Sequence, residues 1–210
     1  MRSRLFIAAA SLAAFTSVAV AQAPQGGPPP GPPVSVRGTI EKLDDQAITV
    51  KSRNGSLTVV KLAPNYRVST LDRKKLSDIH SGDFVGATSV PGTDGKLHAT
   101  EIHIFPPALR GAGEGQQPWD TGPNAVMTNA TVSGVAKATQ GQVLSVNYKG
   151  STAQMIVDKT TVIVAPSATP ASAKDLKRGK TVYVYARKAA DGTLTTGNVT
   201  VEKNGVKPPM

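Results

Sequence analysis

Apolar and polar residues alternate along much of this chain, which is the pattern of strands that bury one face. From residue 34 to 51 the apolar positions recur with a period of two, so that Ile48 and Val50 share one face. The dipeptides Asn54-Gly55, Asp94-Gly95 and Asp191-Gly192 separate such runs and tolerate the positive φ of tight hairpin turns. The pattern predicts an all-β chain.

The alternating runs occur twice. VRGTI at Val36 resembles VSGVA at Val132, and DIHSGDFVGA at Asp78 resembles DLKRGKTVYV at Asp175. The second copy follows 96 residues later in the early part and 97 residues later in the late part, which chance does not explain. We interpret the chain as two tandem repeats at 34–105 and 130–202, with a linker at 106–129 and a tail at 203–210.

Each repeat is predicted to contain three strands, one short helix and two more strands. The helical segments are KKLSDIHSG, from Lys74 to Gly82, and SAKDLKRG, from Ser172 to Gly179, and each ends in a glycine at the C-cap position. Five strands with a helix between the third and the fourth is the order of an OB-type barrel. The predicted fold is therefore all-β, with two tandem, small, five-stranded OB-like barrels.

The N-terminus has the pattern of an export signal. Arg2 and Arg4 precede an apolar run that is too short to span a membrane, and Ala19-Val20-Ala21 matches a cleavage site. We predict a signal peptide at 1–21, cleavage near Ala21, and a periplasmic or secreted mature protein without a transmembrane span. Residues 22–33 are rich in Pro and Gly and predict an extended tether, with recognition by an aromatic groove as the alternative.

Charge and cysteine content limit the classes of partner that the protein is expected to bind. Without Arg2 and Arg4 the chain has 22 basic and 14 acidic residues, a net charge of +8, which favours anionic surfaces such as phospholipid headgroups or acidic glycans. The absence of cysteine means that core packing alone holds the exported fold. Nucleic-acid binding needs aromatic platforms, and Tyr148 is the only aromatic residue on the predicted second and third strands, so we expect no nucleic-acid partner.

The sequence contains no catalytic motif. G-x-S-x-G, H-E-x-x-H and S-x-x-K are all absent, and the paired carboxylates Asp44 and Asp45 lie on a predicted turn. We therefore predict that the protein is not an enzyme and uses no cofactor.

One strand contains residues that could bind a metal ion. Glu101 and His103 are two apart and so face the same side, and His98 is close in sequence but has the opposite parity. Imidazole and carboxylate groups suit zinc or copper. The alternative is that all three are ordinary polar strand residues, since Ile102 and Ile104 mark the buried face.

Two further features could contact a partner. Basic residues surround the second helical segment: Lys174, Lys177, Arg178 and Lys180. They form either an anion-binding surface or an ordinary solvent-exposed helix face. Tyr183 and Tyr185 are predicted to face outward, and Trp119 is the only tryptophan. Exposed Trp and Tyr are favoured interface anchors, although Trp119 could instead pack on a barrel and fix the linker.

The motifs V-x-G-x-(I/V), D-L-x-x-G and D-G-x-L resemble those of a family of exported bacterial proteins of unknown function. Both blocks match, and Ile79 stands where the first copy would have Leu. The resemblance implies export and the barrel fold, and it implies no activity. We therefore predict an exported, non-catalytic binding module of the cell envelope that contacts an envelope protein or a polyanion. The alternative is a periplasmic protein that binds or handles divalent metal ions.

Overall fold

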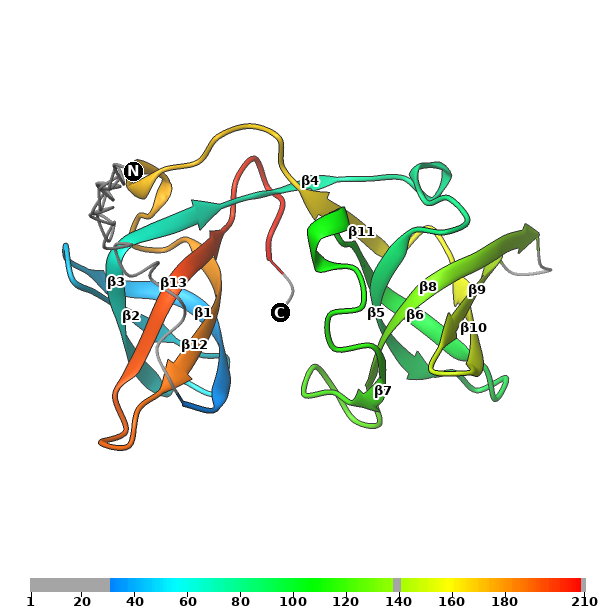
Figure 1. Cartoon of the computed structure of the whole chain (residues 1–210), viewed down its shortest axis with the longest axis horizontal. Coiled ribbons are helices and arrows are strands. Elements are labelled where there is room, and N and C mark those ends of the chain that lie inside the picture. The colour runs from blue at the N-terminus through cyan, green and yellow to red at the C-terminus, as the bar shows by residue number, and fades with distance from the viewer. Residues whose placement is uncertain (1–30, 138–140, 209–210) are drawn as a thin grey trace, which may run out of the picture.

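The computed structural model describes residues 31–137 and 141–208 (Figure 1). The predicted signal peptide with its cleavage site, and the tether up to residue 30, lie outside the described residues. The described part contains strands and three single turns of 3-10 helix, and it has no α-helix. As the alternation predicted, the chain is all-β, and its strands form two closed five-stranded barrels.

Barrel 1 takes its strands from the two ends of the described chain. Its members, in sheet order, are β1 (Pro33–Leu43), β12 (Thr181–Lys188), β13 (Leu194–Val201), β3 (Leu57–Ser69) and β2 (Ala47–Lys51). All neighbours are antiparallel except β13 and β3, whose parallel pairing closes the barrel.

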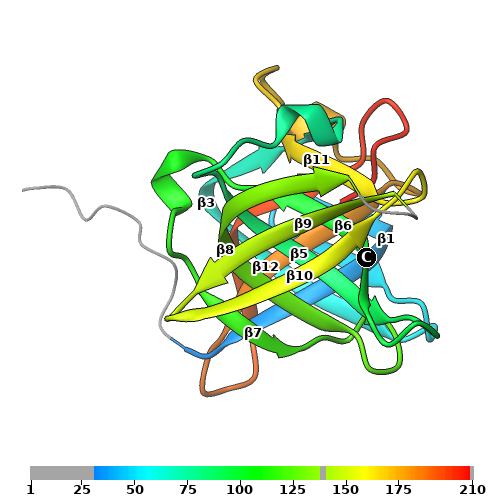
Figure 2. The ribbon, with the colours of Figure 1, turned by 90° about the vertical axis from the view of Figure 1, so that its right-hand side faces the viewer.

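Barrel 2 is formed by the middle of the chain and is nearest the viewer in Figure 2. Its members, in sheet order, are β10 (Ser151–Val157), β9 (Gln142–Tyr148), β8 (Val126–Lys137), β5 (Phe84–Pro91) and β6 (Leu97–Ile104). The parallel pairing of β10 with β6 closes it, so both barrels follow one scheme. Three short strands extend its sheet; they are β4 (Leu71–Arg73), β11 (Val162–Pro166) and β7 (Gly115–Pro118).

The prediction that each block forms its own barrel is wrong. Barrel 1 combines the first three strands of the first block with the last hairpin of the second, and barrel 2 has the converse composition. After the third strand of the first block, the segment from Tyr66 to Arg73 has neither Gly nor Pro and contains β-branched residues that favour extension. The chain therefore runs straight on into the other barrel instead of turning back.

The two crossing segments pair with each other where the chain passes between the barrels. β4 runs antiparallel to β11, with Leu71 opposite Pro166, and the Ser167 amide donates to the Thr70 carbonyl at 2.9 Å. The Lys74 amide donates to the carbonyl of Ile163 at 2.8 Å. Each crossing segment thus satisfies backbone groups of the other.

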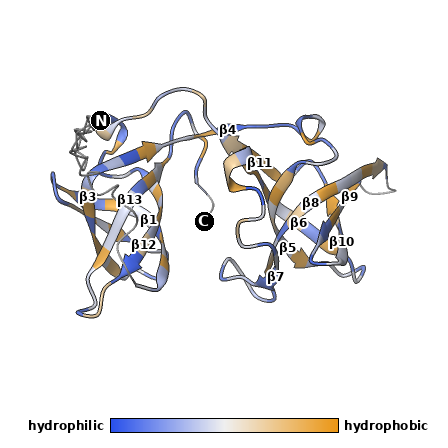
Figure 3. Cartoon of the chain, viewed as in Figure 1, coloured by the Kyte–Doolittle hydropathy of each residue, from blue (hydrophilic) through white to orange (hydrophobic). Residues whose placement is uncertain are grey.

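Each barrel has a core of its own, to which both blocks contribute. In Figure 3, apolar and polar stretches alternate along the strands of both barrels. The core of barrel 1 joins Ile40, Ile48, Val50 and Val60 to a set from the exchanged hairpin, Val182, Val184, Val199 and Val201. Barrel 2 is filled in the same way by Val85 and Ile102 from the first block and Val132, Leu144, Val146 and Met155 from the second.

The alignment of Val36 with Val132 predicts the buried face of the two first strands correctly, but their register is wrong. Thr39 lies opposite Lys51 and Thr181, and in barrel 2 the corresponding position is Thr131, opposite Asn147 and Phe84. The counterpart of Val36 is therefore Thr128, four residues before Val132. Alternation repeats every two residues, so a shift by an even number leaves the buried face unchanged and the pattern cannot detect it.

The predicted helix between the third and fourth strands is absent from both copies. Each segment forms a single 3-10 turn, η1 (Leu76–Asp78) or η3 (Ala173–Asp175). The next residue is extended and inserts its side chain into a barrel core, Ile79 into barrel 2 and Leu176 into barrel 1. Gly82 and Gly179 do not cap helices; they supply the positive φ of the turns that follow.

The linker at 106–129 has regular structure of its own. It contains η2 (Pro107–Leu109) and then β7, which forms a hairpin with β8. The tail also has a defined place, because Lys203 and Val206 form a tight turn and Pro208 is buried. Figure 1 shows the C-terminal segment between the two barrels.

The topology predicts how fragments will fold. Residues 70–171 contain every strand of barrel 2, so this fragment should be a monomer that unfolds cooperatively on heating. Residues 34–105 have strands of both barrels and should give no monomeric cooperative unit. Circular dichroism during heating, with the mass in solution measured by light scattering, tests both fragments. A stable monomer of 34–105 would show that a block can close on itself.

Candidate anion-binding groove

The exchange of hairpins concentrates the positive charge on barrel 1. The segments that form it, 31–69 and 172–208, contain 14 Lys and Arg residues and 6 Asp and Glu residues, a net charge of +8. Residues 70–171 contain 8 of each and are neutral. The basic residues of the second block from Lys174 onward, which the sequence placed on a barrel of their own, therefore join Arg37, Lys42, Lys51, Arg53, Lys61 and Arg67 on barrel 1.

Most of these basic side chains have no acidic partner. Within the described part, only Arg37, Arg178, Lys180 and Lys203 of barrel 1 lie within 4.0 Å of a carboxylate oxygen. The other ten are free to attract an anion. At low ionic strength salt screens these charges weakly, so their fields add over the whole face of the barrel.

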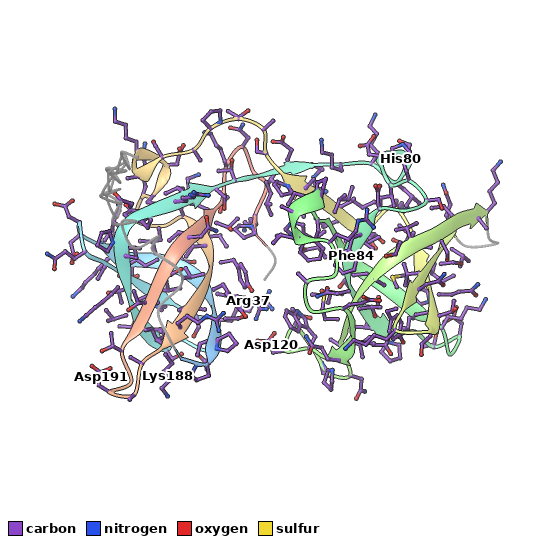
Figure 4. All side chains as sticks on the ribbon, viewed as in Figure 1. Arg37, His80, Phe84, Asp120, Lys188 and Asp191 are labelled. Atoms are coloured by element: carbon purple, nitrogen blue, oxygen red, sulfur yellow. The ribbon has the colours of Figure 1, made fainter. Side chains whose placement is uncertain are left out.

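An open groove of about 580 Å³ lies on barrel 1. It runs along the start of β1, between the β2–β3 turn and the β12–β13 turn. Its charged lining consists of Arg37, Arg53, Lys188 and Asp120, and Ser35, Ser52, Asn54 and Thr58 add polar groups. Figure 4 shows Lys188 at one end of barrel 1 and Arg37 on the side that faces Asp120.

Arg37 forms the end of the groove and joins the two barrels. Its side chain is 11% exposed, and Nη1 donates to both carboxylate oxygens of Asp120, at 2.8 and 2.7 Å. Its guanidinium lies 4.8 Å from the Trp119 ring centroid and 5.2 Å from that of Tyr183, distances typical of cation–π contacts. Because Asp120 already holds Nη1, Arg53 and Lys188 are the cations of the groove that a ligand could meet first.

The aromatic residues predicted to bind a partner differ in their exposure to solvent. Trp119 and Tyr183 are partly buried against Arg37, so Trp119 fixes the segment after β7 to barrel 1. Tyr185 alone is strongly exposed, at 50%, and the Arg187 guanidinium lies 5.6 Å from its ring centroid. Of the three, only Tyr185 remains available to a partner.

The predicted basic cluster lies at one end of barrel 1. Arg178 pairs with Glu41 of the first block at 2.7 Å, and Lys180 lies 4.0 Å from Glu202. Lys174 and Lys177 are exposed and have no ion-pair partner in the described residues. The cluster is thus half neutralised, and it adds to the charge of barrel 1 from a position outside the groove lining.

The three residues of the predicted metal site, His98, Glu101 and His103, lie on one side of β6. They do not converge on a common site. A bulge at Thr100 lets both Ala99 and Ile102 face the core, which cancels the opposite parity of His98. His98 Nε2 nevertheless contacts Asp94 Oδ1 at 3.0 Å, and the His103 ring stacks on Phe105 at 5.1 Å. Across the described ranges, no three His, Asp or Glu side chains are grouped to hold a metal ion.

Burial changes the protonation of two of these residues. It raises the pKa of Glu101 to about 7, against a smaller opposing effect of the Arg37 charge. It also lowers the pKa of His103 to about 4, so this imidazole stays neutral at physiological pH. The neutral ring, stacked on Phe105, acts as a packing residue of barrel 2.

No family model, no curated protein and no solved structure matches this chain. The resemblance to an exported bacterial family therefore stays a prediction. Within residues 31–137 and 141–208, no helix is long and apolar enough to cross a membrane.

Sequence reasoning did not identify the groove residues Arg37, Arg53 and Lys188. They lie on a first strand, a hairpin turn and a fourth strand that belong to different blocks. No local signal links them, because only the exchange of the last hairpin brings Lys188 beside β1.

Glu101 should make the protein less stable as the pH rises. The carboxyl is protonated in the folded state up to about pH 7, whereas in the unfolded chain it ionises near its ordinary value of 4.5. Its stabilisation is complete below pH 4.5 and is lost as the pH rises through 7. Glu101→Gln should remove this loss and be roughly 2 kcal/mol more stable than the parent at pH 8. Urea unfolding at pH 5 and pH 8 measures the difference, and equal pH dependence in the two proteins would contradict the assignment.

Arg37→Lys should loosen the contact between the barrels. Lysine keeps the charge but loses the planar group that lies over Trp119 and Tyr183, and a cost of roughly 1–2 kcal/mol is expected. Thermal unfolding measures it, and the emission of Trp119, the only tryptophan, should shift to longer wavelength. Arg67→Lys, at an exposed position on β3, is the matched control. Unchanged stability and emission would show that the Arg37 stack is not structural.

Proposed function

We propose that this chain is an exported, non-catalytic binding module whose barrel 1 holds an anionic partner in the cell envelope. The observation that carries the proposal is the segregation of charge: barrel 1 has a net charge of +8 and barrel 2 has none. A charge spread evenly over the surface would serve solubility alone. Concentration on one barrel, beside an open groove, is typical of a surface that attracts an anion.

The architecture supports the same function. The sheet order and the parallel pairing of the third with the last strand are those expected of an OB-type barrel, and both barrels share them. OB-type barrels bind oligonucleotides and oligosaccharides on one strand face and in the adjoining loops. The groove of barrel 1 shares one of these elements, the loop between the last two strands, and it lies over β1.

The export signal decides which anions the protein meets. Residues 1–21 predict a periplasmic or secreted location, where acidic glycans, anionic lipids and acidic proteins are the available partners. The metal-handling alternative gains no support, because His98 and His103 are engaged in separate contacts. Non-catalytic binding requires only charge and shape, and the groove provides both.

Binding to an immobilised sulfated polysaccharide, heparin, tests the proposal with the mature chain 22–210. Binding should occur at low salt and weaken steeply as salt is added, since exposed charges are screened. Arg53→Gln with Lys188→Gln should weaken it roughly tenfold, equivalent to about 1.4 kcal/mol.

The matched control is Lys137→Gln with Lys159→Gln, which removes the same charge from exposed positions on barrel 2. The control should bind like the parent. If both double variants lose the same affinity, the binding depends on net charge and not on barrel 1. No binding by the parent at low salt would refute the proposed function.

A further inference from the structure

Barrel 1 has a second unusual surface, distinct from the groove. Leu57 and Val59 are each 59% exposed, more than any other large hydrophobic residue of the described chain. They are two residues apart on β3, so both point away from the core, while Val60 and Leu62 point into it. Single exposed aliphatic residues are common, but two adjacent ones on the outer face of a strand form a small apolar patch.

Lysines frame this patch. In the strand register, Lys51 lies opposite Leu57, Thr49 lies opposite Val59, and Lys61 lies opposite Ala47. Lys42 lies opposite Thr49 on the next strand. None of the three lysines is within 4.0 Å of a carboxylate in the parts of the chain that are described.

The outer face of β2 and β3 therefore presents only neutral and basic side chains. We call it the Leu57 face, and its members are Lys42, Ala47, Thr49, Lys51, Leu57, Val59 and Lys61. Acidic side chains lie only at its borders: Glu41 is paired with Arg178, Asp44 and Asp45 are exposed on the β1–β2 turn, and the charge of Lys61 helps to lower the pKa of Asp191. Figure 1 shows β2 and β3 on the side of barrel 1 that is turned away from barrel 2, so among the described residues barrel 2 does not cover this face.

The chemistry of the Leu57 face discriminates between partners. A second copy of the chain, placed by a two-fold axis, would bring lysines against lysines, which disfavours that dimer. A soluble polyanion would pair with the lysines and leave the aliphatic side chains in water. An anionic bilayer satisfies both, since its headgroups attract lysine and its acyl boundary accepts leucine and valine.

We propose that the Leu57 face is a membrane-contact surface that docks barrel 1 on an anionic lipid bilayer. This inference rests on the proposed function, because it names anionic lipid as a partner of barrel 1. It adds that contact requires burial of Leu57 and Val59 as well as charge. The lysines bring the barrel to the surface, and the aliphatic pair enters the interface between headgroups and acyl chains.

Co-sedimentation of the mature chain with vesicles tests the proposal. Vesicles of phosphatidylcholine and phosphatidylglycerol in equal parts should bind the protein, and vesicles of phosphatidylcholine alone should not. Leu57→Ser with Val59→Ser leaves every charge in place and should lower the partition coefficient about tenfold. Leu109→Ser with Val135→Ser changes two exposed apolar residues of barrel 2 and is the matched control.

The heparin measurement separates the two proposals. The Leu57/Val59 variant should bind heparin like the parent, which also shows that it is folded. If this variant binds the anionic vesicles as well as the parent does, charge alone is responsible and the membrane-contact surface is overturned. If the parent binds heparin but no vesicles, the same conclusion follows and the proposed function stands.

A reporter on the patch gives an independent test. The chain has no cysteine, so Leu57→Cys allows a single environment-sensitive fluorophore to be attached there. Its emission should shift to shorter wavelength on anionic vesicles, as the probe leaves water. The same label at Val135→Cys on barrel 2 should not shift. Equal behaviour of the two labels would overturn the proposal.

Discussion

The antiparallel pairing of β4 with β11 is the contact on which the rest of this molecule depends. At Leu71 and Pro166 the two crossing segments meet, and each satisfies backbone groups that would otherwise lie exposed between the barrels. With both segments extended, the last hairpin of each block can only reach the opposite barrel. Because of that exchange, the parallel closures of β3 with β13 and of β10 with β6 each join a strand of one block to a strand of the other.

The exchange also explains the electrostatics. The two blocks are both basic, but a slightly acidic part of the first block and a basic part of the second change places, and barrel 1 receives all of the net charge. The same rearrangement brings Lys188 beside β1 and so forms the groove with Arg53. The proposed anion groove depends on the topology, because no single block contains all of its lining residues, whereas the Leu57 face lies within the first block.

Contacts between the barrels include charged side chains, and burying such a side chain without a partner would cost free energy. Arg37 is nearly buried, and Asp120 together with two aromatic rings compensates its charge. Glu101 faces the same region and is held closer to its neutral form by burial. These interactions fix the segment that carries Trp119 to barrel 1, so Trp119 acts inside the molecule and not as an exposed anchor.

The sequence by itself determined the strands, their buried faces and the hairpin turns, because alternation and Asn-Gly or Asp-Gly dipeptides are local signals. Register and strand partners were decided by the tertiary structure. A shift of four residues keeps every face of the first strand, and the partner of a hairpin is set by the direction of the chain that precedes it. The 3-10 turns replaced the expected helices for a similar reason, since Ile79 and Leu176 are drawn into the cores. The groove of Arg37, Arg53 and Lys188 joins both blocks, and local pattern contains no information about such a meeting.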